Sequence, residues 1–205
     1  PVDLRRTLRA QLRSGGELIR LRRRRSGVRR RRVVMLIDIS GSMQPYADSL
    51  LRLAHRIVRA MPNQVEVFTI GTRLTRISPA LRVRQADEAL AAVGRLVPDW
   101  SGGTRLGEVI GAFLSRWGRR GLARSAVVVI ASDGWERGDA QLLGEQIRQL
   151  RLLAYAVIWM NPHRGKPGYA PIQTGIQACL PHLDRMVAGH SLATFAELLE
   201  VLANA

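Results

Sequence analysis

Short apolar runs rich in β-branched residues alternate along this chain with longer segments whose apolar residues recur every three or four positions. The runs Val33 to Asp38 and Ser125 to Ser132 are apolar throughout their interiors, as expected of strands that are buried on both faces. Strands of this kind separated by amphipathic helices form a parallel sheet with helices on both sides. We therefore predict an α/β fold with an open, mostly parallel sheet, in one domain over residues 33–205.

The bounds of the individual elements follow from these periods and from turn and cap residues. The predicted strands are Val33–Asp38, Gln64–Ile70, Leu74–Ile77, Ser125–Ser132, Leu152–Trp159 and Leu183–Val187. The predicted helices are Tyr46–Met61, Asp87–Leu96, Thr104–Trp117, a helix capped by Asp139 that runs to Leu150, and Leu192–Leu202.

Residues 1–32 are predicted to be a separate, arginine-rich N-terminal extension. They hold 13 arginines against Asp3 and Glu17, a net charge of +11 out of +16 for the chain. Such a segment binds nucleic acid or an anionic membrane, docks on an acidic protein face, or is simply a solvated arm. No aromatic residue lies among these arginines, so the segment has no aromatic ring on which the bases of a nucleic acid could stack. The turn dipeptide Ser26-Gly27 also allows a hairpin of Glu17–Arg25 with Val28–Ile37.

Side chains that carry oxygen follow two of the predicted strands and begin one helix. The run Asp38-Ile39-Ser40-Gly41-Ser42 ends the first strand, and Asp133 follows the strand that ends at Ser132. Thr104 begins a helix directly after two glycines. Open α/β sheets bind ligands at the carboxyl ends of their strands. If the two strands are neighbours, the two carboxylates lie side by side at this edge.

The chemistry of these residues favours magnesium. Mg²⁺ takes six oxygen ligands in an octahedron and keeps several waters, so a few hydroxyls and two carboxylates form a sufficient but incomplete shell. With neutral hydroxyls as inner ligands, the ion keeps much of its positive charge. A carboxylate from another protein would then be a strong sixth ligand. Mn²⁺ and Ca²⁺ are possible substitutes for Mg²⁺.

The set Asp38, Ser40, Ser42, Thr104 and Asp133 resembles the metal-ion-dependent adhesion site (MIDAS) of von Willebrand factor A (VWA) domains. The resemblance implies the Rossmann-like VWA fold. It also implies that Ser40, Ser42 and Thr104 contact the metal directly, while Asp38 and Asp133 act mainly through bound waters. The implied activity is metal-dependent protein binding, without catalysis.

A narrower resemblance lies further along the chain. The runs Ser132–Asp139, Trp159–Pro162 with Gly165–Tyr169, and Gly189–Leu192 are similar to those of the CoxE-like subgroup of bacterial VWA proteins. That subgroup is associated with maturation of carbon monoxide dehydrogenase. It implies a MoxR-type AAA+ ATPase and a client metalloenzyme as partners. Because the chain opens at Pro1 and members of the subgroup are longer at the N-terminus, we expect it to be a piece of a longer protein.

Three residues behind the second carboxylate are candidates for a rim that a partner touches: Trp135, Glu136 and Arg137. Aromatic residues and arginine are favoured anchors of protein interfaces. The alternative is that Trp135 only covers the edge of the sheet, and both interpretations stay open.

Two competing functions are weighed against the adaptor. A phosphohydrolase would use Asp38 as nucleophile, but Ser40 stands where that mechanism needs a second acid, and the only lysine is Lys166. RNA binding would use the arginine-rich extension. The histidines, including His163, show no metal-ligand spacing, so no zinc site is expected. The single cysteine, Cys179, indicates a cytoplasmic protein without disulfides.

Overall fold

The computed structural model describes residues 31–97, 103–164, 173–189, 194–196, 198 and 200. Its six-stranded sheet has the order β3-β2-β1-β4-β5-β6. Every strand pairs in parallel except β3, which runs antiparallel to β2 at one edge. The strands are β1 (Val33–Asp38), β2 (Val65–Ile70), β3 (Leu74–Arg76), β4 (Val127–Ala131), β5 (Ala156–Asn161) and β6 (Arg185–Ala188). The predicted Rossmann-like, mostly parallel sheet is confirmed.

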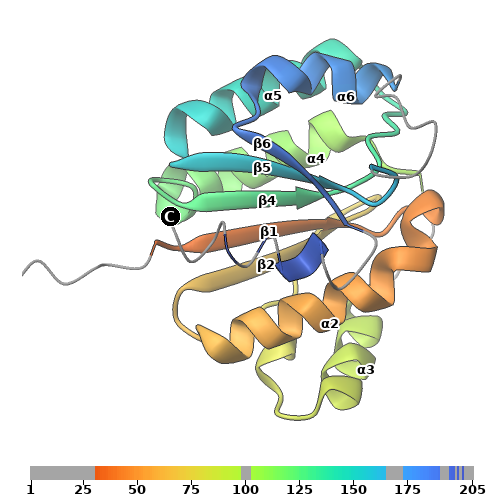
Figure 1. The fold of residues 1–205 in the computed structure, drawn as a ribbon, viewed down its shortest axis with the longest axis vertical. Helices are drawn as coiled ribbons and strands as arrows, with labels where there is room; N and C mark the ends of the chain where they lie inside the picture. The colour runs from red at the N-terminus through yellow and green to blue at the C-terminus, as the bar shows by residue number, and fades with distance from the viewer. Residues whose placement is uncertain are drawn as a thin grey trace, which may run out of the picture.

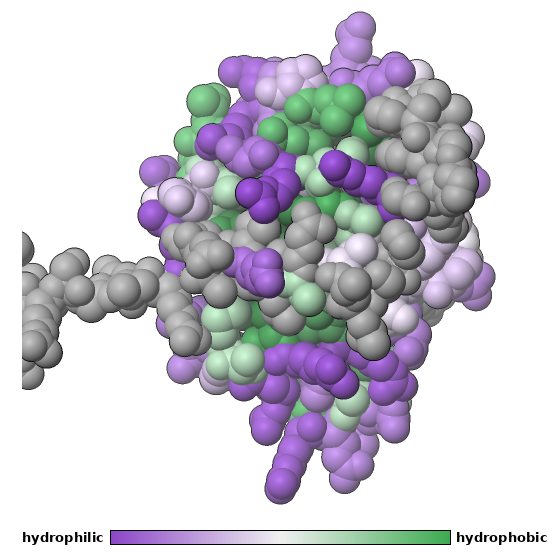
Figure 2. All heavy atoms as spheres, in the orientation of Figure 1, coloured by the Kyte–Doolittle hydropathy of each residue, from purple (hydrophilic) through white to green (hydrophobic). Residues whose placement is uncertain are grey.

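Helices cover both faces of this sheet (Figure 1). On one face lie α2 (Gln44–Ala60) and α3 (Ala86–Leu96), and on the other lie α4 (Leu106–Phe113), α5 (Ala140–Leu153) and α6 (Thr174–Cys179). Short 3₁₀ turns complete the connections: η1 (Gly41–Met43), η2 (Ala80–Arg82) and η4 (Leu180–His182). Over the outer sides of α2 and α3, Figure 2 shows mainly hydrophilic side chains.

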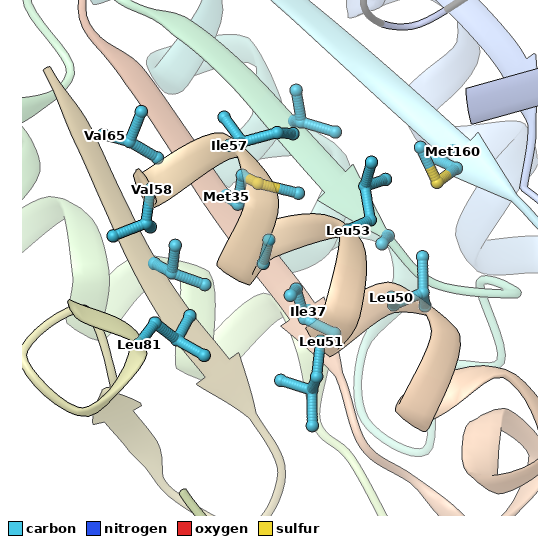
Figure 3. Packing of buried hydrophobic residues seen from close by; sticks show 14 of the residues in the cluster. Met35, Ile37, Leu50, Leu51, Leu53, Ile57, Val58, Val65, Leu81 and Met160 are labelled. Carbon is cyan, nitrogen blue, oxygen red and sulfur yellow. The ribbon is translucent and has the colours of Figure 1, made fainter. Parts of the chain in front are cut away.

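Alternate residues of the strands supply two apolar layers, one for each face. Met35 and Ile37 of β1 pack with α2, in the cluster drawn in Figure 3. Their neighbours Val34 and Leu36 belong to the cluster under α4, α5 and α6. All four side chains are fully buried. Burial on both faces explains why β1 is a continuous apolar run and why its carboxyl end is held rigidly.

Two predicted bounds on the second face were wrong. The strand expected from Leu152 begins at Ala156, because α5 continues to Leu153. An apolar run that spans a helix end and a strand start has no period that separates the two. The helix expected over Thr104–Trp117 begins at Leu106, and after Phe113 it continues as the wider π-helical segment η3 (Leu114–Leu122). Gly121 in η3 has a φ of 122°, which ends the helical path.

Some predictions fall on residues outside the described part. These include the extension up to residue 30, most of the proposed hairpin, and residues 98–102 of the loop before Thr104. The last predicted helix is described only in part, and its residues 194–196 are helical. Within the described residues, no helix combines the length and the apolar character that crossing a bilayer requires.

Candidate metal centre

The carboxyl ends of β1 and β4 meet at one edge of the sheet and form the centre of the site. The two strands are parallel neighbours, with Ile37 opposite Ala131. Asp38 is the last residue of β1, and Asp133 stands two residues beyond β4. The condition set by the sequence, that these strands be neighbours, is therefore met. Both aspartates are fully buried.

The Asp38 carboxylate binds three separate segments. Its Oδ1 accepts hydrogen bonds from the Ser40 backbone N–H at 2.8 Å and from Thr104 Oγ1 at 3.2 Å. Its Oδ2 accepts one from Ser132 Oγ at 2.6 Å. Burial raises the pKa of Asp38, the hydrogen bonds from Ser132 and Ser40 lower it, and the negative charge of Asp133 raises it further; the net direction is upward.

The two serines bring their hydroxyls together on the loop that leads into α2. Ser40 Oγ and Ser42 Oγ are 3.3 Å apart. Ser40 is buried at the rim, whereas Ser42, in η1, is exposed. Thr104, 2% exposed, approaches from the start of α4 and is tied to Asp38. Three hydroxyl groups from two loops thus surround the edge at which the carboxylates lie.

Asp133 has one oxygen engaged and one oxygen without a partner. Its Oδ1 accepts a hydrogen bond from the Trp135 backbone N–H at 3.1 Å. Its Oδ2 is buried and has no hydrogen-bond partner among the described residues. The loop can turn here because Gly134 has a φ of 81°, and a Cβ at this position would clash with Ile176.

The charge of the two carboxylates is not balanced by arginine. In the described part of the chain, no arginine forms an ion pair with Asp38 or Asp133, and His163 Nε2 lies 4.0 Å from Asp133 Oδ2. An uncompensated buried carboxylate costs several kcal/mol. The described residues contain no group of three or more His, Cys, Asp or Glu side chains suited to a metal. The donor set is therefore hydroxyls and two carboxylates, the hard oxygen ligands that suit Mg²⁺. Metal binding by these five residues stays a prediction.

The three residues of the predicted rim differ in their surroundings. Trp135 is 64% exposed. Glu136 instead serves the start of α4, since its Oε2 accepts a hydrogen bond from the Gly107 N–H at 2.9 Å. The Arg137 side chain lies directly against Gly103, where a Cβ would collide with it. Of the three, Trp135 offers the apolar surface that an interface requires, and contact with a partner stays a prediction.

Two residues of β5, Trp159 and Asn161, belong to this edge, although the sequence did not place them there. Asn161 is fully buried, donates from Nδ2 to the Asp133 carbonyl at 3.1 Å, and accepts at Oδ1 from the His163 N–H at 2.8 Å. Trp159 Nε1 donates to the Ser132 carbonyl at 2.8 Å. The sequence signal that could have indicated Asn161 is a polar residue at the end of an apolar strand, as for Asp38.

The family described as VWA domain containing CoxE-like protein matches residues 1–195. The chain belongs to this family. The match includes the arginine-rich extension as well as the VWA domain. Among curated proteins no relative matches the chain.

Solved structures with the same fold are distant in sequence. The von Willebrand factor type A structure from Catenulispora acidiphila is 19% identical, with a TM-score of 0.58 over 84% of this CoxE-like chain and 42% of its own. An aerotolerance-related membrane protein from Bacteroides fragilis is 14% identical, with a TM-score of 0.55 over 85% of this chain and 100% of its own. These likenesses establish the VWA fold.

A third neighbour is proximal thread matrix protein 1 from the mussel byssus, in a structure with a zinc-occupied MIDAS motif. It is 14% identical, with a TM-score of 0.54 over 84% of this chain and 47% of its own. The CoxE-like chain thus spans less than half the length of the mussel and Catenulispora proteins.

Proposed function

We propose that this CoxE-like VWA domain is a non-enzymatic protein-binding module that holds Mg²⁺, or Mn²⁺ or Ca²⁺ in its place, with Asp38, Ser40, Ser42, Thr104 and Asp133. The observation that carries the proposal is the buried Oδ2 of Asp133, which has no hydrogen-bond partner among the described residues and lies beside a second buried carboxylate. A divalent cation is the group whose charge satisfies both. The zinc-occupied MIDAS motif of the mussel protein supports a divalent metal in a domain of this fold.

Each residue has a distinct task in this proposal. Asp38 fixes the positions of Ser40 and Thr104 through its hydrogen bonds, so the hydroxyls are held before any ligand arrives. Asp133 supplies its second oxygen, which has no hydrogen-bond partner among the described residues. When bound, the cation supplies a positive charge that accepts an Asp or Glu carboxylate from a partner protein. Trp135 provides exposed aromatic surface beside that contact.

The geometry favours binding over phosphoryl transfer. A nucleophilic aspartate must present a free oxygen to its substrate. Both oxygens of Asp38 already accept hydrogen bonds, and its side chain is fully buried. This arrangement fits an Asp38 that positions its neighbours through hydrogen bonds, rather than one that attacks phosphorus.

Membership of the CoxE-like family supports the identity of the partners. We propose a MoxR-type AAA+ ATPase as the direct partner and a client metalloenzyme, such as carbon monoxide dehydrogenase, as the beneficiary of the complex. A cytoplasmic location agrees with the single cysteine, Cys179, which is buried and free. The thiol lies in the core, and this burial raises its pKa to about 12.

Calorimetry and affinity capture test the proposal together. Mg²⁺ should bind to the wild-type chain in a 1:1 ratio, and Asp133→Asn should remove this binding. The MoxR-type ATPase should be retained on the immobilised protein in Mg²⁺ and released by chelator. Asp139→Asn is a matched control from the same loop, because Asp139 caps α5 through the Gln141 N–H and lies outside the metal set. Equal retention with Mg²⁺ and with chelator would contradict the proposal.

A further inference from the structure

His163, for which the sequence shows no metal-ligand spacing, faces the oxygen of Asp133 that lacks a hydrogen bond. His163 follows β5, and its Nε2 lies 4.0 Å from Asp133 Oδ2. Its side chain is 33% exposed, while that of Asp133 is 1% exposed. The third strand of the edge therefore adds a nitrogen donor at the mouth of a site that otherwise consists of oxygens.

The backbone of His163 is fixed by Asn161, and its ring contacts Tyr46. Its backbone N–H donates to Asn161 Oδ1 at 2.8 Å, and Asn161 Nδ2 donates to the carbonyl of Asp133 at 3.1 Å. One buried amide thus fixes the loop of the histidine relative to the loop of the aspartate. The ring of Tyr46, in α2, meets the His163 ring edge-on, with centroids 5.7 Å apart and an interplanar angle of 85°. The backbone anchor places the ring beside Asp133, which is the position that a metal-binding histidine requires.

The two atoms come within reach of a shared cation after a small rotation of the imidazole. A metal with bonds of about 2.1 Å to a nitrogen and an oxygen allows those atoms to be up to about 4.2 Å apart, and a tetrahedral arrangement brings them to about 3.4 Å. The observed 4.0 Å is about 0.6 Å longer than the tetrahedral separation. A small rotation of the one-third-exposed imidazole closes this gap.

We propose that His163 is an additional ligand of the metal at Asp133, and that it shifts the selectivity of the site from Mg²⁺ towards first-row transition ions such as Co²⁺ and Zn²⁺. The inference rests on the proposed metal site and adds a specificity-determining residue to it. Neutral imidazole is a good ligand for zinc and the late transition metals, whereas Mg²⁺ and Ca²⁺ prefer oxygen. Because oxygen sites also bind zinc more tightly than magnesium, the decisive quantity is the change in the affinity ratio when the imidazole is removed.

The test compares Mg²⁺ and Co²⁺ binding by the full chain, wild type and variants, using calorimetry and the visible absorption spectrum of Co²⁺. His163→Ala and His163→Gln should weaken Co²⁺ binding about tenfold and shift the Co²⁺ absorption bands, while the Mg²⁺ affinity changes less than about twofold. His182→Ala, which removes a histidine on η4, should change neither. Asp133→Asn should abolish binding of both ions, which assigns the spectrum to this site.

The possible failures are distinguishable. If wild type binds Mg²⁺ but His163→Ala leaves the Co²⁺ to Mg²⁺ affinity ratio and the spectrum unchanged, the ligand role of His163 is overturned and the proposed function stands. If His163→Ala tightens both ions equally, His163 is a competing positive charge, and the ligand role is again overturned. If wild type binds neither ion, the proposed function itself fails, and this inference fails with it.

Discussion

The parallel strands have two sets of ends, and the side chains at these ends differ in how their charges are paired. We call the side where the strands end the carboxyl edge, and the side where they begin the amino edge. At the carboxyl edge, Asp38 and Asp133 are fully buried and form no ion pair with an arginine of the described residues. At the amino edge, the partly buried acids Glu66 and Asp184 each pair with an arginine. There Arg32 donates to the carbonyl of Gly121 at 2.9 Å, and Arg31 lies over the ring of Tyr155 at 3.6 Å. Among the described residues, the fully buried acids without an arginine partner lie at the carboxyl edge.

This difference indicates where function lies. Exposed arginines keep their hydration and contribute little to stability. Buried acids without a counter-charge destabilise the fold, and such groups persist where binding of a ligand compensates for them. The same sheet thus has an amino edge whose acids are paired with arginines and a carboxyl edge arranged for a cation. The following substitutions distinguish the two.

The largest effect is expected from Asp38→Ala. The change leaves the Ser40 N–H, the Thr104 hydroxyl and the Ser132 hydroxyl without their acceptor in a buried site. We expect the free energy of unfolding to fall by about 3 kcal/mol, measured by urea denaturation in chelator. Asp139→Ala removes an exposed helix cap and should cost only about 1 kcal/mol. A loss below that of the control would show that the Asp38 network does not stabilise the edge.

Asp133→Asn is expected to separate stability from metal binding. Asparagine keeps the acceptor for the Trp135 N–H but removes a buried negative charge beside Asp38. In chelator the variant should be as stable as wild type or more so. Mg²⁺ at a hundred times its dissociation constant should raise the unfolding free energy of wild type by about 2.7 kcal/mol and leave the variant unchanged. Stabilisation of both proteins by Mg²⁺ would place the ion elsewhere.

Much of this arrangement could be predicted from the sequence, because it depends on local rules. The apolar run of β1 ends at Asp38, and that of β4 ends just before Ser132 and Asp133, so strand ends alone brought the carboxylates to one edge. Thr104 was placed at the same edge by the start of a helix, and Asp139 was correctly identified as the cap of α5.

The parts that sequence reasoning missed depend on contacts between distant segments. No spacing relates His163 to Asp133, which meet only because β5 pairs with β4 and Asn161 joins their loops. Glu136 was predicted as part of a rim, yet it accepts a hydrogen bond from Gly107, 29 residues earlier. The extension of α5 to Leu153 was missed because its apolar residues merge with those of β5.

Glu66 is a partly buried acid that forms an ion pair with Arg76. The two aspartates of the metal site have no such partner among the described residues. Partial burial pushes the pKa of Glu66 up, but hydrogen bonds from Arg76 and Ser78 outweigh burial and hold the pKa below its usual value. A lowered folded-state pKa means that the stabilisation is complete above the unfolded pKa and is lost as the pH falls through the folded one. Glu66→Gln should therefore cost about 1–2 kcal/mol at pH 7 and progressively less below pH 4.

Urea denaturation at pH 7 and pH 3 measures this dependence. Glu108→Gln is the control, because Glu108 and Arg105 form an exposed pair with side chains 55% and 64% exposed. The control should change the unfolding free energy by less than about 0.5 kcal/mol at either pH. If Glu66→Gln lowered the free energy of unfolding equally at both pH values, Glu66 would contribute through its shape and not through its charge.

The smallest effect is expected at the amino edge, from the double variant Arg119→Ala, Arg124→Ala. Arg119 contacts Gln149, and Arg124 donates to the Arg119 carbonyl at 3.3 Å, both at the exposed surface. The free energy of unfolding should change by less than about 0.5 kcal/mol.

The Mg²⁺ affinity of this double variant tests whether the two edges are electrically independent. The six residues of β1 separate the edges by about 20 Å, more than twice the screening length of about 8 Å at 0.15 M salt. Calorimetry at that salt concentration should therefore give the wild-type affinity within about 1.5-fold. A stronger affinity in the variant would mean that the arginines oppose the cation across the sheet, and the division into two independent edges would then be wrong.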